Sequence, residues 1–182
     1  MKRQKLLVIL AFALSALGLE SCYPEPDFDL TPSITYRGVE QYTRRNAQNA
    51  LFDSLVLVVR FQDGDGNLGL SATLPEDEAA PFNPGSEFYH NFLVNIYRKE
   101  NGEFVPIRVG NQAINYNGRF PRVSTDTRVE PLEGDIRFSL NIFRNNAIRQ
   151  GDVIKFDIQI IDRALNKSNV VETSEIVMFS KE

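Results

Sequence analysis

The sequence is poor in the side chains on which much enzyme chemistry depends. It has one cysteine, Cys22, one histidine, His90, and no tryptophan among 182 residues. A single cysteine excludes an intramolecular disulfide, and one cysteine with one histidine exclude a zinc site of ordinary composition. A Ser–His arrangement would rest on His90 alone, and nothing singles out a carboxylate pair for glycoside hydrolysis. We therefore expect a protein without enzymatic activity, with His90 at the entrance to a strand.

Lysine and arginine are missing from a long stretch in the middle of the chain. Between Arg60 and Arg98 the charged side chains are all acidic: Asp63, Asp65, Glu76, Asp77, Glu78 and Glu87. The net charge of the whole chain is −4, so nucleic acid is not an expected partner. Like charges at this density repel, and an ion or a basic partner would relieve the repulsion.

Long apolar runs are absent except at the N-terminus. Three basic residues among the first five precede an apolar stretch over residues 6–17, which is the layout of a secretory signal and too short to span a bilayer. The following Leu19-Glu20-Ser21-Cys22 resembles a lipobox, with Glu20 as a departure from the pattern. We predict that residues 1–21 are a cleaved signal peptide and that Cys22 carries lipid; the alternative is a secreted protein with a free thiol.

Residues 22–32 contain three prolines, three acids and no base. Proline disfavours helix and like charges extend a chain, so this segment is predicted to be a tether between the lipid and the domain. Acidic residues soon after a lipidated cysteine resemble the surface-export signals of Bacteroidota lipoproteins. We expect an outer-membrane location anchored by lipid, with the cell surface favoured over the periplasmic side.

No sustained helical periodicity follows the signal. Residues 136–142 and 154–160 alternate apolar and polar side chains, as half-buried strands do, and residues 54–61 have one wholly apolar face and one mixed face. Asn101-Gly102 between two strand-like runs predicts a hairpin. A weaker strand is expected near Ile34 and Tyr36, and a last one from about Val170 to Phe179. Residues 71–87 are predicted to be a long loop, and residues 33–182 an all-β domain with an antiparallel sandwich fold.

Residues 156–169 resemble the late strand and turn of bacterial immunoglobulin-like domains, in which an Asp-x-Ala-x-Asn-x-Ser turn links two strands. Together with residues 61–70 and 117–121, this turn is similar to Bacteroidota lipoproteins of uncharacterised function. The resemblance implies an immunoglobulin-like β-sandwich behind a lipid anchor. It implies no particular activity, because fold alone does not determine function.

Asp63-Gly64-Asp65-Gly66-Asn67 is the sharpest chemical feature of the sequence. Oxygen-bearing side chains at alternate positions around glycines are typical of Ca²⁺ loops, so Asp63, Asp65 and Asn67 are candidate ligands. The EF-hand register fails, because Leu68 stands where that loop requires glycine. Glu76, Asp77 and Glu78 would supply further oxygens only if the loop folded back. An ordinary Asp-Gly turn is the favoured interpretation. Asp162 is likewise expected to hydrogen-bond to the backbone of its own turn.

Two functions remain open. The first is a non-enzymatic binding module in the envelope, with the membrane as one partner through its lipid and another protein as the second. The alternative is a Ca²⁺-dependent module that binds glycans or adheres to surfaces. Five aromatic residues could form a sugar-binding face, although core packing is expected for most of them: Tyr89, Phe92, Tyr97, Tyr116 and Phe120.

Overall fold

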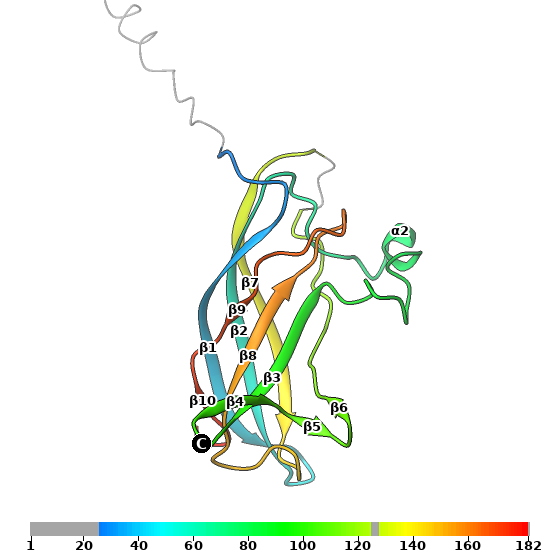
Figure 1. The fold of residues 1–182 in the computed structure, drawn as a ribbon. Helices are drawn as coiled ribbons and strands as arrows, with labels where there is room; N and C mark the ends of the chain where they lie inside the picture. Colours follow the sequence, from blue (N-terminus) through cyan, green and yellow to red (C-terminus); the bar gives the residue numbers. More distant parts are fainter. Residues whose placement is uncertain (1–25, 125–127, 182) are drawn as a thin grey trace, which may run out of the picture.

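The computed structural model describes residues 26–124 and 128–181. The predicted signal peptide and Cys22 lie outside these residues. The described chain is all-β, with antiparallel pairing throughout its open sheets (Figure 1). Its one helix, α2 (Pro75–Glu78), has four residues. No helix in the described part is long and apolar enough to cross a membrane.

The first sheet has three long strands in the order β1-β2-β7. They are β1 (Ser33–Arg45), β2 (Leu51–Asp63) and β7 (Leu132–Phe143). Leu57 at the centre of β2 lies between Val39 of β1 and Phe138 of β7. Burial alternates along β2 and β7, as the sequence periodicity predicts, so one face of this sheet is turned toward the core.

The second sheet has the order β10-β8-β3-β4, and β9 also pairs with β8. Its strands are β3 (Phe92–Glu100), β4 (Glu103–Pro106), β8 (Val153–Ile160), β9 (Val171–Glu172) and β10 (Ile176–Val177). A separate small hairpin joins β5 (Arg108–Val109) and β6 (Gln112–Ala113). The predicted turn at Asn101-Gly102 is confirmed, because both residues have positive φ, 51° and 93°.

The two sheets share one hydrophobic core. Phe92 of β3 stacks on Phe138 of β7 with ring centroids 4.3 Å apart, which brings side chains of the two sheets into direct contact. The predicted apolar face of β8 is confirmed, since Ile154, Phe156 and Ile158 are all fully buried.

Two strand predictions need correction. The weaker strand expected near Ile34 and Tyr36 is present, but it continues to Arg45 and has 13 residues. The expected last strand is broken into β9 and β10, because the Thr173 hydroxyl, in place of a backbone carbonyl, accepts the N–H of Phe156 at 3.0 Å. The predicted loop over residues 71–87 contains no strand, and α2 is its one regular element.

One end of the domain gathers several chain segments. β1 begins there, β2 and β8 end there, and the N-terminal segment enters there, while the C-terminus lies at the opposite end (Figure 1). The antiparallel pairing of Ser33 with Gln62 places the start of β1 beside the end of β2. Loops that are far apart in the sequence therefore meet at this end.

Candidate metal centre

β2 has a buried aspartate near each end, Asp53 and Asp63, and only Asp53 has hydrogen-bond partners. Asp53 accepts three hydrogen bonds: from the Thr43 hydroxyl at 2.6 Å, the Gln41 amide at 2.8 Å and the Phe179 N–H at 2.7 Å. Asp63 is equally inaccessible, with 0% of its surface exposed. Both carboxylate oxygens of Asp63 nevertheless lack a hydrogen-bond partner. A buried carboxylate without partners is costly, which points to a ligand that the protein itself does not supply.

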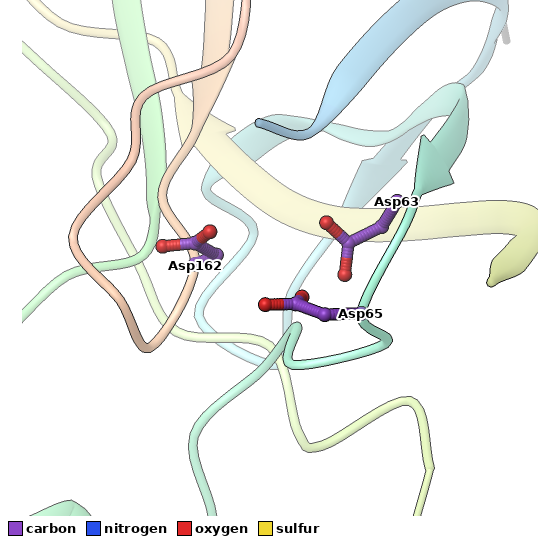
Figure 2. Close-up of side chains that lie close together, drawn as sticks. All are labelled: Asp63, Asp65 and Asp162. Atoms are coloured by element: carbon purple, nitrogen blue, oxygen red, sulfur yellow. The ribbon is translucent and has the colours of Figure 1, made fainter. Parts of the chain in front are cut away.

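Asp63 faces two further carboxylates. Asp65 follows it in the loop after β2, and Asp162 lies in the turn after β8 (Figure 2). One oxygen from each of the three residues lies within 4.8 Å of the other two. Asp162 is 2% exposed and Asp65 is half-buried. The structure thus brings together three carboxylates from two loops that are far apart in the sequence.

Neighbouring asparagines orient two of the three carboxylates. The Asn67 side-chain amide donates to Asp65 Oδ2 at 2.7 Å, and the Asn166 amide donates to Asp162 Oδ2 at 2.9 Å. The Asn166 N–H donates to Asp162 Oδ1 at 2.7 Å, so the predicted Asx-type turn at Asp162 is confirmed. The Asn67 Oδ1 atom is itself buried without a partner, which adds a fourth oxygen to the candidate ligands.

The cluster is electrostatically unfavourable as three bare carboxylates. Burial raises the pKa of Asp63 to about 7, and the neighbouring charges of Asp65 and Asp162 act in the same direction. The Asn67 N–H lowers this pKa, but it donates its hydrogen bond to Asp65 Oδ1 at 3.3 Å. Among the described residues, no lysine or arginine forms an ion pair with any of the three carboxylates.

Arg163 is the basic residue nearest in the chain to Asp162, and it supports the loop. Its guanidinium donates to the carbonyl oxygens of Leu68 and Gly69, each at 3.2 Å, and its backbone N–H donates to the Asn67 carbonyl at 3.3 Å. Arg163 therefore ties the turn after β8 to the loop after β2. The two ligand-bearing loops are held together by backbone contacts as well as by their shared position.

The sequence offers Asp63, Asp65 and Asn67 as candidate ligands but favours a plain turn, and it also favours a turn for Asp162. The structure places the three carboxylates together. No sequence signal joins Asp162 to the Asp63 loop, because β2 and β8 belong to different sheets and the two residues meet only when the sheets pack together, where Leu68 and Asp162 form an isolated bridge. The three carboxylates form a hard-oxygen donor set, which suits Ca²⁺, and the Asn67 Oδ1 atom is a further candidate because it is buried without a partner. These residues fit Ca²⁺, because a bound ion would contact the two Asp63 oxygens that have no hydrogen-bond partner in the protein.

The expectation that the acidic stretch lacks neutralising bases is wrong. Arg122 donates to both oxygens of the buried Asp77, each at 2.7 Å, and reaches Glu76 at 3.2 Å. Arg119 pairs with Glu78 at 3.0 Å. The three acids around α2 are therefore held by arginines from residues 119–122, and they do not join the Asp63 cluster.

His90 and three of the candidate aromatic residues pack against other side chains of the domain. His90 lies two residues before β3, as expected at a strand entrance, and its ring contacts that of Tyr89 with centroids 4.9 Å apart. Burial, with the Arg119 charge, lowers the pKa of His90. Phe92 and Phe120 are buried, and the partly buried Tyr116 packs against the core. These three aromatic side chains are core residues rather than a sugar platform.

Comparisons with protein-family models, with curated proteins and with solved structures found no match to this chain. Its function is therefore argued from the geometry of its own residues.

Proposed function

We propose that this chain is an exported, lipid-anchored envelope protein whose immunoglobulin-like β-sandwich is a non-enzymatic binding module stabilised by a bound Ca²⁺ ion. The observation that carries the cation is Asp63, fully buried with both oxygens unpartnered and aimed at two other carboxylates. The anchor is proposed from the apolar N-terminus and Cys22, in an outer membrane of the Bacteroidota type.

Calcium suits the Asp63 cluster better than other metal ions do. A divalent cation offsets two of the three negative charges and supplies the missing partner of Asp63. The donor atoms are all oxygens, which disfavours zinc and other metals that prefer nitrogen or sulfur. Ca²⁺ accepts six to eight oxygens in flexible arrangements, whereas Mg²⁺ demands a tight octahedral shell, so a site built on two loops suits Ca²⁺ better.

The partner of the module is proposed to be another envelope protein, and a glycan is the second candidate. The glycan is favoured by a pocket of about 370 Å³ beside residues 63–69, which we call the cation loop. Its walls include Leu70 and Phe120, which are joined by a backbone hydrogen bond of 3.0 Å, together with Tyr89 and Arg119. An ordered cation loop would therefore also fix one wall of this pocket.

The cation proposal predicts that Ca²⁺ raises the melting temperature of the purified protein at pH 8, where a carboxyl group of pKa about 7 is mostly ionised. Binding to the folded state at a hundredfold excess over Kd adds about 2.7 kcal/mol. That corresponds to a rise of roughly 5–10 °C for a domain of this size. Thermal melts in millimolar Ca²⁺ and in EGTA measure the shift, and Mg²⁺ is expected to do much less.

Asp63→Asn is expected to abolish the calcium-dependent shift while folding normally, because asparagine keeps the volume and removes the buried charge. Asp157→Asn is the matched control, since Asp157 also has a buried oxygen without a partner but lies on β8 outside the cluster. A wild-type melting temperature unchanged by Ca²⁺, or a full shift in Asp63→Asn, would contradict the proposed site.

The anchor proposal predicts that Cys22→Ser eliminates lipid attachment, because no other thiol is present in the chain. Metabolic labelling with a fatty-acid probe followed by membrane fractionation tests this, with the wild-type chain as the positive control. Equal labelling of the variant and the wild type would show that Cys22 is not the lipidated residue.

A further inference from the structure

The N-terminal segment, residues 26–32, lies against the first ligand-bearing loop. The Gly64 N–H donates to the Asp29 carbonyl at 2.9 Å. The contact is so close that a Cβ atom on Gly64 would lie 2.4 Å from the Phe28 carbonyl oxygen. Because Gly64 stands between Asp63 and Asp65, the segment that arrives from the predicted anchor touches the cation loop itself.

The second ligand-bearing loop holds the start of β1, which directly follows this segment. Asn169, shortly after the Asp162 turn, accepts the Ile34 N–H at 2.8 Å and donates its amide to the Ile34 carbonyl at 2.9 Å. The chain that enters the domain is thus fastened at two points, one by each loop that carries candidate ligands. Its position depends on the two loops keeping their present separation.

A cation between the loops would act on that separation together with the Arg163 hydrogen bonds that already join them. With Ca²⁺ bound, Asp63 and Asp162 share one ion, and the loops that carry them are drawn together. Without it, the carboxylates repel each other across a buried space, which favours opening of this end of the domain. We infer that Ca²⁺ occupancy decides whether residues 26–32 are docked on the domain or released, an inference that rests on the cation site proposed above.

Docking changes the length of free chain between the predicted lipid and the domain. Release of residues 29–32 would add four residues to the chain that leads to the predicted lipid, which is about 13 Å when extended at roughly 3.3 Å per residue. Calcium would therefore hold the binding module closer to the membrane surface and restrict its orientation.

Hydrogen–deuterium exchange on the purified full chain tests the inference. The informative amides are those of Thr31 and Ile34, which donate to Asp29 Oδ1 and Asn169 Oδ1 and lie outside both ligand loops. Their exchange is expected to be at least about tenfold slower in 2 mM Ca²⁺ than in EGTA, the change expected of a local opening suppressed by the ion. Amides in the core of β8 are expected to exchange equally slowly in both conditions.

Asn169→Ala separates docking from ion binding. Asn169 is outside the carboxylate cluster, and both of its side-chain hydrogen bonds are to Ile34. We expect fast exchange at Thr31 with or without Ca²⁺, while calorimetry still detects Ca²⁺ binding. Gly64→Ala disturbs the other attachment, because the three atoms nearest to the added methyl group belong to the backbone of Phe28 and Asp29, and exchange at Thr31 is expected to change in the same direction.

The possible results lead to distinct conclusions. If calorimetry detects Ca²⁺ binding but exchange at Thr31 and Ile34 does not change, the docking inference is overturned and the cation site stands. If β8 loses its protection together with the N-terminal segment, the ion controls folding of the whole domain, and the docking inference is again overturned. If no Ca²⁺ binds, both the site and the inference are overturned.

Discussion

Replacing Phe156 with alanine is expected to lower the free energy of unfolding by about 3–5 kcal/mol. Phe156 lies on the buried face of β8 with 0% of its surface exposed, and its ring meets that of Tyr116 edge-on with centroids 6.4 Å apart. Loss of the ring removes apolar burial and leaves a cavity between the sheets, which neighbouring side chains fill only in part. Urea denaturation of the purified protein measures the change, provided that the free energy of unfolding has the same slope against urea concentration in both variants.

Asp157→Asn is the control for this prediction, because Asp157 is the next residue along β8 and lies on the opposite face. Its side chain is half-buried, Asp157 raises the pKa of the neighbouring Tyr97 to about 12, and asparagine keeps the volume of the side chain. We expect a loss of about 1 kcal/mol or less. Equal denaturation midpoints for the two variants would mean that the register of β8 is wrong.

Gly69→Ala is expected to be at least as damaging as the loss of Phe156. Gly69 has φ of +91°, and an added Cβ would lie 2.1 Å from the Pro121 carbonyl oxygen and 2.5 Å from Arg122 Cα. The obstructing atoms belong to the backbone, so relief requires the loop after β2 to move away from residues 121–122. Thermal unfolding should show a loss of several kcal/mol, beyond the roughly 1–3 kcal/mol of backbone strain alone.

Gly102→Ala isolates the contribution of backbone strain. Gly102 has nearly the same φ, +93°, in the β3–β4 turn, and nothing lies within 4 Å of an added Cβ. The cost there should be limited to strain, about 1–3 kcal/mol. If both alanine variants lose the same stability, the close approach at Gly69 does not contribute, and the packing of the cation loop on Pro121 is looser than the structure indicates.

Local sequence patterns predict those parts of the fold in which one face is buried and the other exposed. The alternation in β2, β7 and β8 and the Asn-Gly turn after β3 are of this kind, and the structure confirms them. β1 is different, because most of its side chains are half-buried or exposed. Its 13 residues form a strand mainly through pairing with β2, and no periodicity in the sequence reveals that.

The same distinction applies to the candidate site. The spacing of Asp63, Asp65 and Asn67 is a local pattern that the sequence displays. Two other properties depend on the fold: the approach of Asp162, and the neutralisation of the acids around α2 by Arg119 and Arg122. Counting charges along the chain therefore overstated the repulsion near α2. It could not show that Asp63, Asp65 and Asp162 gather at one end of the domain.

The three donors around Asp53 also constrain the order in which the domain can form. Two of them come from the adjacent strand β1, but the third is the N–H of Phe179, 126 residues further along the chain. The Lys181 carbonyl accepts the N–H of Thr43 at 2.7 Å. Residues 178–181 therefore complete the β1–β2 hairpin at the end of the domain opposite to the two ligand-bearing loops. Until those residues are in place, the Asp53 carboxylate lacks one of its three hydrogen-bond donors, and burying it is penalised. The first hairpin to be synthesised is thus among the last parts of the domain to reach its final structure.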